Sequence, residues 1–205
     1  MISTLVGDWV RFRIRGVGQF LARTTHLSPN AFTLLGLLFN IVVAIILGTG
    51  NLLVGGVVAI FAGLFDMLDG AVARVTNQIT VFGGFFDSTL DRYAEAAVYF
   101  GLLVYFINHN ASSTAVLLTF ATIVGSIMVS YTRARAEAAG LSASVGWFAR
   151  PERVVVLAVF LIADQPLWGL WVLAVLTNLT AFQRIFHVWQ TTRGTDRPPR
   201  SRPSA

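Results

Sequence analysis

Long apolar segments, separated by short polar breaks, recur along the chain. Six such segments stand out: 31–50, 52–68, 83–107, 112–132, 153–163 with its flanks, and 167–188. The breaks contain turn-forming residues, as in GTGN at 48–51 and DQP at 164–166. Because about 20 apolar residues of helix cross a bilayer, this pattern predicts an all-α integral membrane protein with six transmembrane helices.

The residues before the first apolar segment have the pattern of an amphipathic helix. Over 1–24, apolar side chains share one face and polar side chains share the other. The apolar face comprises Ile2, Leu5, Val6, Trp9, Val17, Phe20 and Leu21. We expect this segment to lie in the membrane interface, anchored by its arginines. A long basic segment precedes the first apolar run and no small-residue cleavage pattern follows it, so we expect no removable signal peptide.

Composition supports a chain that is embedded in a membrane. The 205 residues are 55% hydrophobic and 12% charged, whereas a soluble domain carries about 25% charged residues. There is no cysteine, which excludes disulfides and thiolate chemistry. The expected organisation is an interfacial helix over 1–24, one six-helix domain over 25–190, and a disordered Pro- and Arg-rich tail over 191–205.

The basic residues predict the orientation of the helices. All fifteen are arginines, and in the six-helix arrangement they fall on one side, near the two termini and the 2–3 and 4–5 connections. By the positive-inside rule, this pattern predicts a multi-pass protein of the cell membrane with cytoplasmic N- and C-termini. The arginines of the tail then lie beside anionic lipid headgroups, and we expect no nucleic-acid partner.

Acidic residues concentrate where the second and third apolar segments meet. Asp66 and Asp69 are spaced i,i+3 and Asp87 and Asp91 are spaced i,i+4, so each pair shares a helix face. Carboxylate oxygens without cysteine or a nearby histidine favour a hard ion such as Mg²⁺ or Mn²⁺. Four carboxylates around one space suit two ions, which is an arrangement used for phosphoryl transfer.

Other roles for these acids stay open from the residues alone. They could cap helices, pair with Arg74 and Arg92, or line the ion path of a transporter or channel. An ion path predicts acids through the depth of the bilayer, whereas these acids lie near one end of their helices. Glu95 lies one turn beyond Asp91 on the same face and is either a support for the ligands or a structural residue.

The acidic stretch fits the pattern D-x2-D-G-x2-A-R-x8-G-x3-D-x3-D. Its eight fixed positions are Asp66, Asp69, Gly70, Ala73, Arg74, Gly83, Asp87 and Asp91. This pattern resembles the signature of the CDP-alcohol phosphotransferase family, which also has six membrane helices after an N-terminal interfacial helix. The resemblance implies that an alcohol attacks the β-phosphorus of a CDP-linked donor and that CMP leaves.

The resemblance also implies roles for individual residues. It makes Asp66, Asp69 and Asp87 ligands of two Mg²⁺ ions, or of Mn²⁺, and makes Asp91 a ligand or the general base. The positions that match nucleotide- and phosphate-binding residues are Gly70, Arg74 and Thr80, with Pro29, Asn30, Ala31 and Phe32 at the opening of the first helix. Ser28 and Pro29 also make an ordinary helix start. The family further implies a homodimer.

Segments outside the signature bear on the acceptor alcohol. DSTLDR at 87–92, SYTRARAEAAGL at 130–141 and RPER at 150–153 resemble the branch of the family that joins CDP-diacylglycerol to inositol phosphate. On this match we assign Arg133 and Arg153 to the acceptor phosphate.

Three features leave the acceptor open. Arg133 stands where that branch often has Lys, and Ala149 replaces an acid that commonly precedes RPER. The arginines also fit a purely topological role, with Arg135 and Glu137 as a simple pair. Glycerol 3-phosphate or serine as acceptor, and an archaeal-type ether-lipid donor, remain alternatives.

Overall fold

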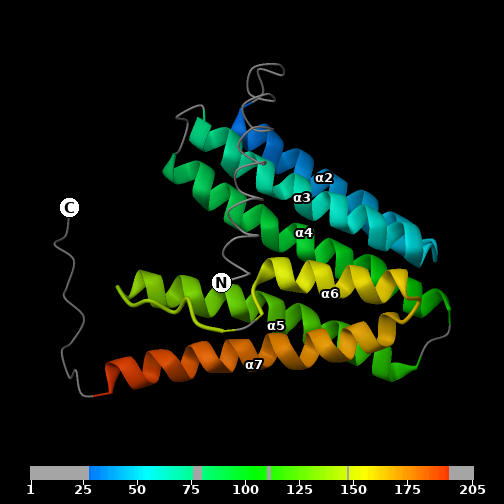
Figure 1. The fold of residues 1–205 in the computed structure, drawn as a ribbon. Helices are drawn as coiled ribbons and strands as arrows, with labels where there is room; N and C mark the ends of the chain where they lie inside the picture. Colours follow the sequence, from blue (N-terminus) through cyan, green and yellow to red (C-terminus); the bar gives the residue numbers. More distant parts are fainter. Residues whose placement is uncertain (1–27, 76–79, 110–111, 147, 194–205) are drawn as a thin grey trace, which may run out of the picture.

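The computed structural model describes residues 28–75, 80–109, 112–146 and 148–193, with only the backbone of 67–75 (Figure 1). The described part contains helices and no strand, which confirms the all-α prediction. The helices are α2 (Pro29–Gly48), α3 (Leu52–Val75), α4 (Val81–Asn108), α5 (Ser113–Ala138), α6 (Arg150–Ile162) and α7 (Pro166–Thr192). The interfacial helix expected over 1–24 and most of the tail expected over 191–205 lie outside the described residues.

The helix starts are set by local capping. Ser28 is the N-cap of α2, its hydroxyl accepts a hydrogen bond from the Ala31 N–H at 3.3 Å, and Pro29 occupies the first turn. Thr80 is the N-cap of α4 and accepts from the Gly83 N–H at 2.9 Å. The capping roles of Ser28 and Thr80 are therefore present, whatever else these residues do.

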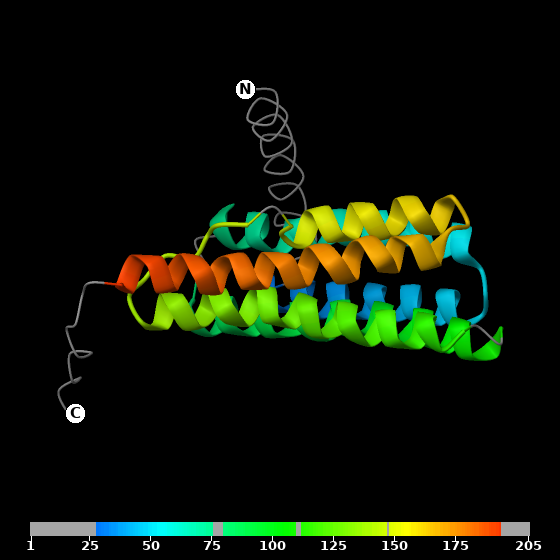
Figure 2. The ribbon, with the colours of Figure 1, turned by 90° about the horizontal axis from the view of Figure 1, so that it is seen from below.

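The six helices form an elongated bundle in which neighbours in space are not always neighbours in sequence. Helix α2 packs against α3 and α4, α6 packs against α3 and α7, and α5 packs against α4 and α7. Viewed from below, α7 lies between α5 and α6 (Figure 2). The core between the helices is mainly apolar, including Val43, Leu47, Leu102, Leu161, Leu170 and Leu173, and a minority of its buried side chains are polar or charged.

Helices α2 and α4 approach each other closely at Gly101. A Cβ atom added there would lie 2.2 Å from the Ala44 carbonyl oxygen. We expect Gly101→Ala to lower the free energy of unfolding by about 1–3 kcal/mol, because the two backbones must move apart. Gly84→Ala is the control, since a Cβ there meets nothing within 4 Å. Thermal unfolding of the detergent-solubilised proteins measures both, and equal Tm values for the two variants would contradict this packing.

The surface has the character of a membrane protein. Among the described residues, α2, α5 and α7 are long and apolar enough to cross a membrane, and Leu52–Asp66 of α3 is a shorter apolar segment. Large apolar side chains such as Phe61, Phe120 and Phe182 are about two-thirds exposed, at 65%, 67% and 67%, which in water would be an aggregation hazard. Six membrane spans and the orientation of the termini stay predictions.

Candidate active site

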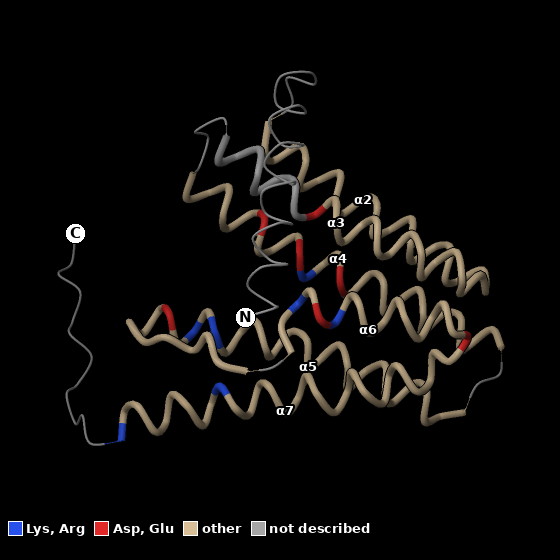
Figure 3. Tube along the Cα trace, in the orientation of Figure 1, with Lys and Arg blue, Asp and Glu red and all other residues tan. Residues whose placement is uncertain are grey.

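The charged residues of the bundle gather where α3, α4 and α6 meet. Figure 3 shows acidic positions on α3 and α4 beside basic positions at the start of α6. Asp66 comes from α3, Asp91 and Glu95 come from α4, and Arg150 and Arg153 come from the first turn of α6. The spacing i,i+4 on α4 and i,i+3 on α6 places each pair on one helix face. Two charged rows therefore face each other across the bundle.

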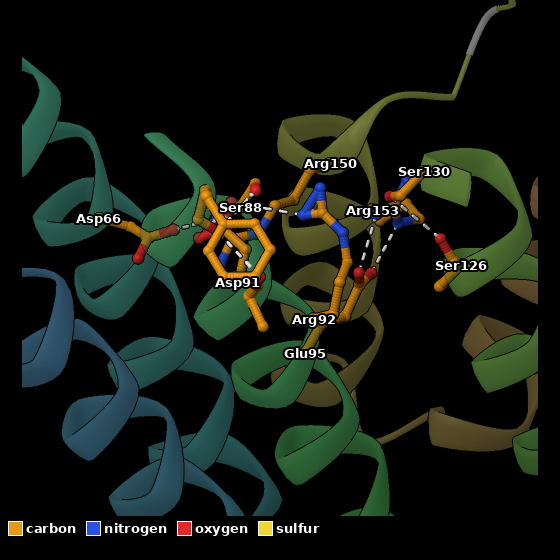
Figure 4. Close-up of polar contacts among 11 residues, drawn as sticks. Asp66, Ser88, Asp91, Arg92, Glu95, Ser126, Ser130, Arg150 and Arg153 are labelled. Carbon is orange, nitrogen blue, oxygen red and sulfur yellow. Dashed lines mark hydrogen bonds and ion pairs between the residues drawn. The ribbon is translucent and has the colours of Figure 1, made fainter. Parts of the chain in front are cut away.

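Arg150 joins the two aspartates that belong to different helices. Its Nη1 lies 2.5 Å from Asp91 Oδ1 and also contacts Asp66 Oδ2 (Figure 4). Arg92 approaches the other oxygen of Asp91, Oδ2, at 3.5 Å. Burial acts to lower the pKa of Arg150, but the carboxylates of Asp91 and Asp66 outweigh it and raise that pKa. Arg150 is therefore a permanent cation between two acids.

Glu95 and Arg153 form a second, more buried pair. Arg153 Nε and Nη2 donate to the two Glu95 oxygens at 2.6 and 2.8 Å, and Nη1 donates to the Phe148 carbonyl at 3.3 Å. The side chain of Arg153 is only 1% exposed, and that of Glu95 is 10% exposed. This forked geometry is the strongest arrangement of an arginine with a carboxylate. Glu95 thus has a structural partner. Arg153 lies near the aspartates, but its guanidinium is hydrogen-bonded to Glu95 and to the Phe148 carbonyl.

The two arginines assigned to the acceptor phosphate have different partners and different exposure. Arg133 lies on α5 and donates from Nε to Glu137 at 2.8 Å, with both side chains more than half exposed. Glu137 therefore pairs with Arg133 rather than with Arg135, contrary to the alternative considered from the sequence. The side chain of Arg133 is 53% exposed, whereas that of Arg153 is only 1% exposed.

The opening of α2 lies beside the start of α4. A Cβ added at Gly83 would lie 3.4 Å from Asn30 Oδ1, and one added at Gly36 would lie 2.9 Å from Asp66 Oδ1. Phe32 is buried and its ring is 6.1 Å from that of Phe65, next to Asp66. The structure therefore places the first helix against both halves of the acidic stretch, and Gly36 is a close-approach position that the signature does not contain.

The remaining signature residues are placed by their helices. Asp87 lies on α4 one turn before Asp91, and both carboxylates interact electrostatically with Asp66. Asp69, Gly70 and Arg74 continue α3 beyond Asp66, and their side chains lie outside the described part of the structure.

The described acids fit a hard divalent cation. Asp66 Oδ2 and Asp91 Oδ1 converge on a single cationic nitrogen of Arg150, so one positive centre can contact both oxygens. Oxygen donors of this kind suit Mg²⁺ or Mn²⁺. Among the side chains that the structure describes, which exclude Asp69, no group of three or more acids, histidines or cysteines is arranged to hold a metal ion.

Comparison with known proteins identifies the class. A model of the CDP-alcohol phosphatidyltransferase family matches residues 26–189. The chain therefore belongs to this family of enzymes, and the resemblance found in its acidic signature is confirmed.

Individual relatives narrow the comparison. The chain is 39% identical over 181 residues to the phosphatidylinositol phosphate synthase of Mycobacterium tuberculosis. The aligned region covers 83% of each chain. It is 32% identical to the archaetidylinositol phosphate synthase of Pyrococcus horikoshii, over 86% of this chain and 91% of that one.

Solved structures of the mycobacterial synthase resemble this fold. The crystal structure with CDP-DAG bound has a TM-score of 0.78 and 32% identity, covering 94% of this chain and 98% of that one. The complex with manganese and citrate has a TM-score of 0.79 and 33% identity, with 93% of each chain covered. This relative is therefore known in one structure with CDP-DAG bound and in another with manganese bound.

Proposed function

We propose that this protein transfers the phosphatidyl group of CDP-diacylglycerol to a hydroxyl of inositol phosphate and releases CMP. The observation that carries the proposal is the convergence of Asp66 and Asp91 on Arg150, the first arginine of RPER. It stands within a chain that matches phosphatidylinositol phosphate synthases over most of its length. In the reaction, the hydroxyl oxygen bonds to the β-phosphorus, the bond from that phosphorus to the bridging oxygen breaks, and that oxygen leaves with CMP.

The aspartates are proposed to hold two divalent ions, Mg²⁺ or Mn²⁺. Asp66, Asp69, Asp87 and Asp91 supply the oxygens, and Asp91 also takes the proton of the attacking hydroxyl. When bound, such ions neutralise a diphosphate and the charge that develops on its leaving group. The manganese complex of the mycobacterial relative supports a divalent metal in this fold. Asp91 fits the role of base because its carboxylate is partly exposed, at 16%, and so remains reachable.

The nucleotide end of the donor is assigned to the residues around the start of α4. Gly70, Arg74 and Thr80 are proposed to bind the nucleotide and its phosphates, with Pro29, Asn30, Ala31 and Phe32 on the other side. The proximity of Asn30 to Gly83 supports this grouping, because it brings the two segments to one place.

The lipid end of the donor is assigned to a groove between α3 and α6. A cavity of about 270 Å³ is lined by Ile60, Gly63, Leu64, Pro151, Val154 and Val155, with Asp66 and Arg150 at its polar end. An apolar groove that ends at charged groups suits a molecule with acyl chains and a diphosphate. This arrangement supports a lipid donor whose chains remain in the membrane.

The acceptor phosphate is assigned to Arg133 and Arg153. We expect Arg133→Gln to raise the KM for inositol phosphate by roughly 10- to 100-fold, the value of one charge-assisted hydrogen bond. The KM for CDP-diacylglycerol should change by less than about threefold. CMP release measures both constants, and Arg135→Gln on the same helix is the matched control. Equal increases in the two KM values would contradict the assignment.

A panel of substrates tests the proposed reaction as a whole. CMP release by the purified protein is compared for inositol phosphate, inositol, glycerol 3-phosphate and serine with CDP-diacylglycerol as donor. We expect inositol phosphate to be used at least about tenfold better than the others. A CDP-linked ether lipid in the same assay tests the donor, since one relative is an archaetidylinositol phosphate synthase. Preference for glycerol 3-phosphate or serine would overturn the acceptor assignment.

The membrane arrangement completes the proposal. We propose six transmembrane helices, an interfacial helix over 1–24, cytoplasmic termini and a homodimer in the cell membrane. The positions of the arginines support this orientation, and a soluble inositol phosphate would then reach the site from the cytoplasm.

A further inference from the structure

Arg150 occupies the position where a cation bound by Asp66 and Asp91 would have to lie. Its Nη1 contacts one oxygen of each carboxylate. A divalent ion that binds these same two oxygens cannot be present together with the guanidinium nitrogen. The two would overlap in volume, and their positive charges would repel each other. Binding of an ion through Asp66 Oδ2 and Asp91 Oδ1 therefore requires Arg150 to move.

The neighbouring arginine shows what a fixed partner looks like in this site. Arg153 is 1% exposed, has a forked pair with Glu95 and donates a further hydrogen bond to the Phe148 carbonyl. Arg150 is 23% exposed, and its ion pairs with the described acids Asp66 and Asp91 both use the nitrogen Nη1. Because Arg153 holds the first turn of α6 beside α4, Arg150 can leave the aspartates without loss of the helix position.

We propose that Arg150 is a displaceable internal cation that competes with the divalent metal for Asp66 and Asp91 and, once released, binds a phosphate of the substrate. Before metal binds, the guanidinium offsets the repulsion between the acids, which is costly for carboxylates that are only 12% and 16% exposed. After release it remains at the polar end of the groove between α3 and α6, which Arg150 itself lines. A guanidinium fork there is suited to phosphate.

The proposal predicts that metal affinity is held down by Arg150. It rests on the divalent-metal site proposed above, but not on the identity of the acceptor. Titration of the purified protein in detergent with Mn²⁺, followed by electron paramagnetic resonance, measures the affinity without catalysis. We expect Arg150→Gln to lower the Kd for Mn²⁺ at least about tenfold, because the competing charge-assisted contacts are lost.

Arg92→Gln is the matched control for the loss of one positive charge beside Asp91. Arg92 lies 3.5 Å from Asp91 Oδ2 and is 32% exposed, but it does not join the two aspartates. We expect the Kd of Arg92→Gln for Mn²⁺ to be lower than that of wild type by less than about threefold. Arg150→Lys keeps the charge but lacks the planar fork, so its Kd should fall between wild type and Arg150→Gln. It serves as the test if Arg150→Gln does not fold.

The outcomes separate this proposal from the metal site itself. If wild type binds Mn²⁺ and Arg150→Gln binds it no more tightly than Arg92→Gln, the competition is refuted and the metal site stands. If none of the proteins binds Mn²⁺, both are refuted.

The fate of the released guanidinium is tested by adding one substrate at a time. A substrate whose phosphate binds the released Arg150 should lower the Kd for Mn²⁺ more in wild type than in Arg150→Gln. The difference in Kd between the two proteins then becomes smaller. A smaller difference with CDP-diacylglycerol assigns the donor phosphate, and a smaller difference with inositol phosphate assigns the acceptor phosphate. A difference that neither substrate narrows would refute the phosphate contact.

Discussion

Replacing Asp91 with asparagine is expected to lower kcat for CMP release by about 10²- to 10⁴-fold, the usual contribution of a general base. Asparagine keeps the size of the side chain and one oxygen, but it cannot take a proton at neutral pH. Because Asp66, Asp69 and Asp87 remain, Mn²⁺ and CDP-diacylglycerol should still bind. The assay is run at saturating metal so that any weaker ligation by asparagine does not limit the rate.

Asp164→Asn is the control for this variant. Asp164 lies in the turn between α6 and α7, at the opposite end of α6 from Arg150, and has a φ of 55°, which asparagine tolerates well. Its kcat should equal that of wild type. Undiminished transfer by Asp91→Asn would contradict the assignment of Asp91 as base. Loss of Mn²⁺ binding in this variant would show that Asp91 acts mainly as a metal ligand.

Replacing Glu95 with glutamine is expected to lower the free energy of unfolding by about 3–5 kcal/mol, because it leaves Arg153 as an uncompensated buried charge. The fork of two hydrogen bonds and the 1% exposure of Arg153 are the reasons for this size. Thermal or denaturant unfolding of the detergent-solubilised protein measures the change.

Glu137→Gln makes the same chemical change in an exposed pair. Glu137 and Arg133 are 55% and 53% exposed, so this variant should alter the free energy of unfolding by no more than about 1 kcal/mol. Similar losses for Glu95→Gln and Glu137→Gln would contradict a structural role for the buried pair.

The contacts of Arg153 bear on its assignment to the acceptor. Arg153→Ala should raise the KM for inositol phosphate more than the KM for CDP-diacylglycerol if the guanidinium also reaches the acceptor phosphate. If Arg153 only anchors α6, Arg153→Ala should destabilise the protein and change the two constants alike. Because Arg153 makes three contacts with Glu95 and Phe148, its substitution also disturbs the structure. Substitution of Arg133, which is exposed, is therefore the sharper test of the acceptor site.

Hydropathy predicted the positions of the helices well and their ends less well. The apolar segment 31–50 became Pro29–Gly48, but 52–68 became Leu52–Val75 and 112–132 became Ser113–Ala138. Apolar runs report the part that suits a bilayer, whereas a helix can continue beyond it, as α5 does through the good helix formers at 133–138. The fifth helix begins at Arg150, in the flank of the segment 153–163, and Pro151 is favoured in its first turn.

The candidate site was predictable within each helix and not between helices. The spacing of Asp87 and Asp91 showed a shared face, and the signature predicted the family that the comparisons confirm. The side chains that pair across helices depend on how α6 is rotated and shifted along its axis relative to α4. Spacing in the sequence does not specify this arrangement. The RPER segment led to the assignment of Arg153, but it did not indicate that Arg150 contacts the aspartates while Arg153 pairs with Glu95.

Identification of the lipid product tests the central claim most directly. Purified protein is given CDP-diacylglycerol, Mg²⁺ and equal concentrations of inositol phosphate and glycerol 3-phosphate, and the lipids are analysed by mass spectrometry with and without a chelator. We predict phosphatidylinositol phosphate as the main product, formed in step with CMP and abolished by the chelator. Phosphatidylglycerol phosphate as the main product, or CMP release that needs neither acceptor nor metal, would contradict the account.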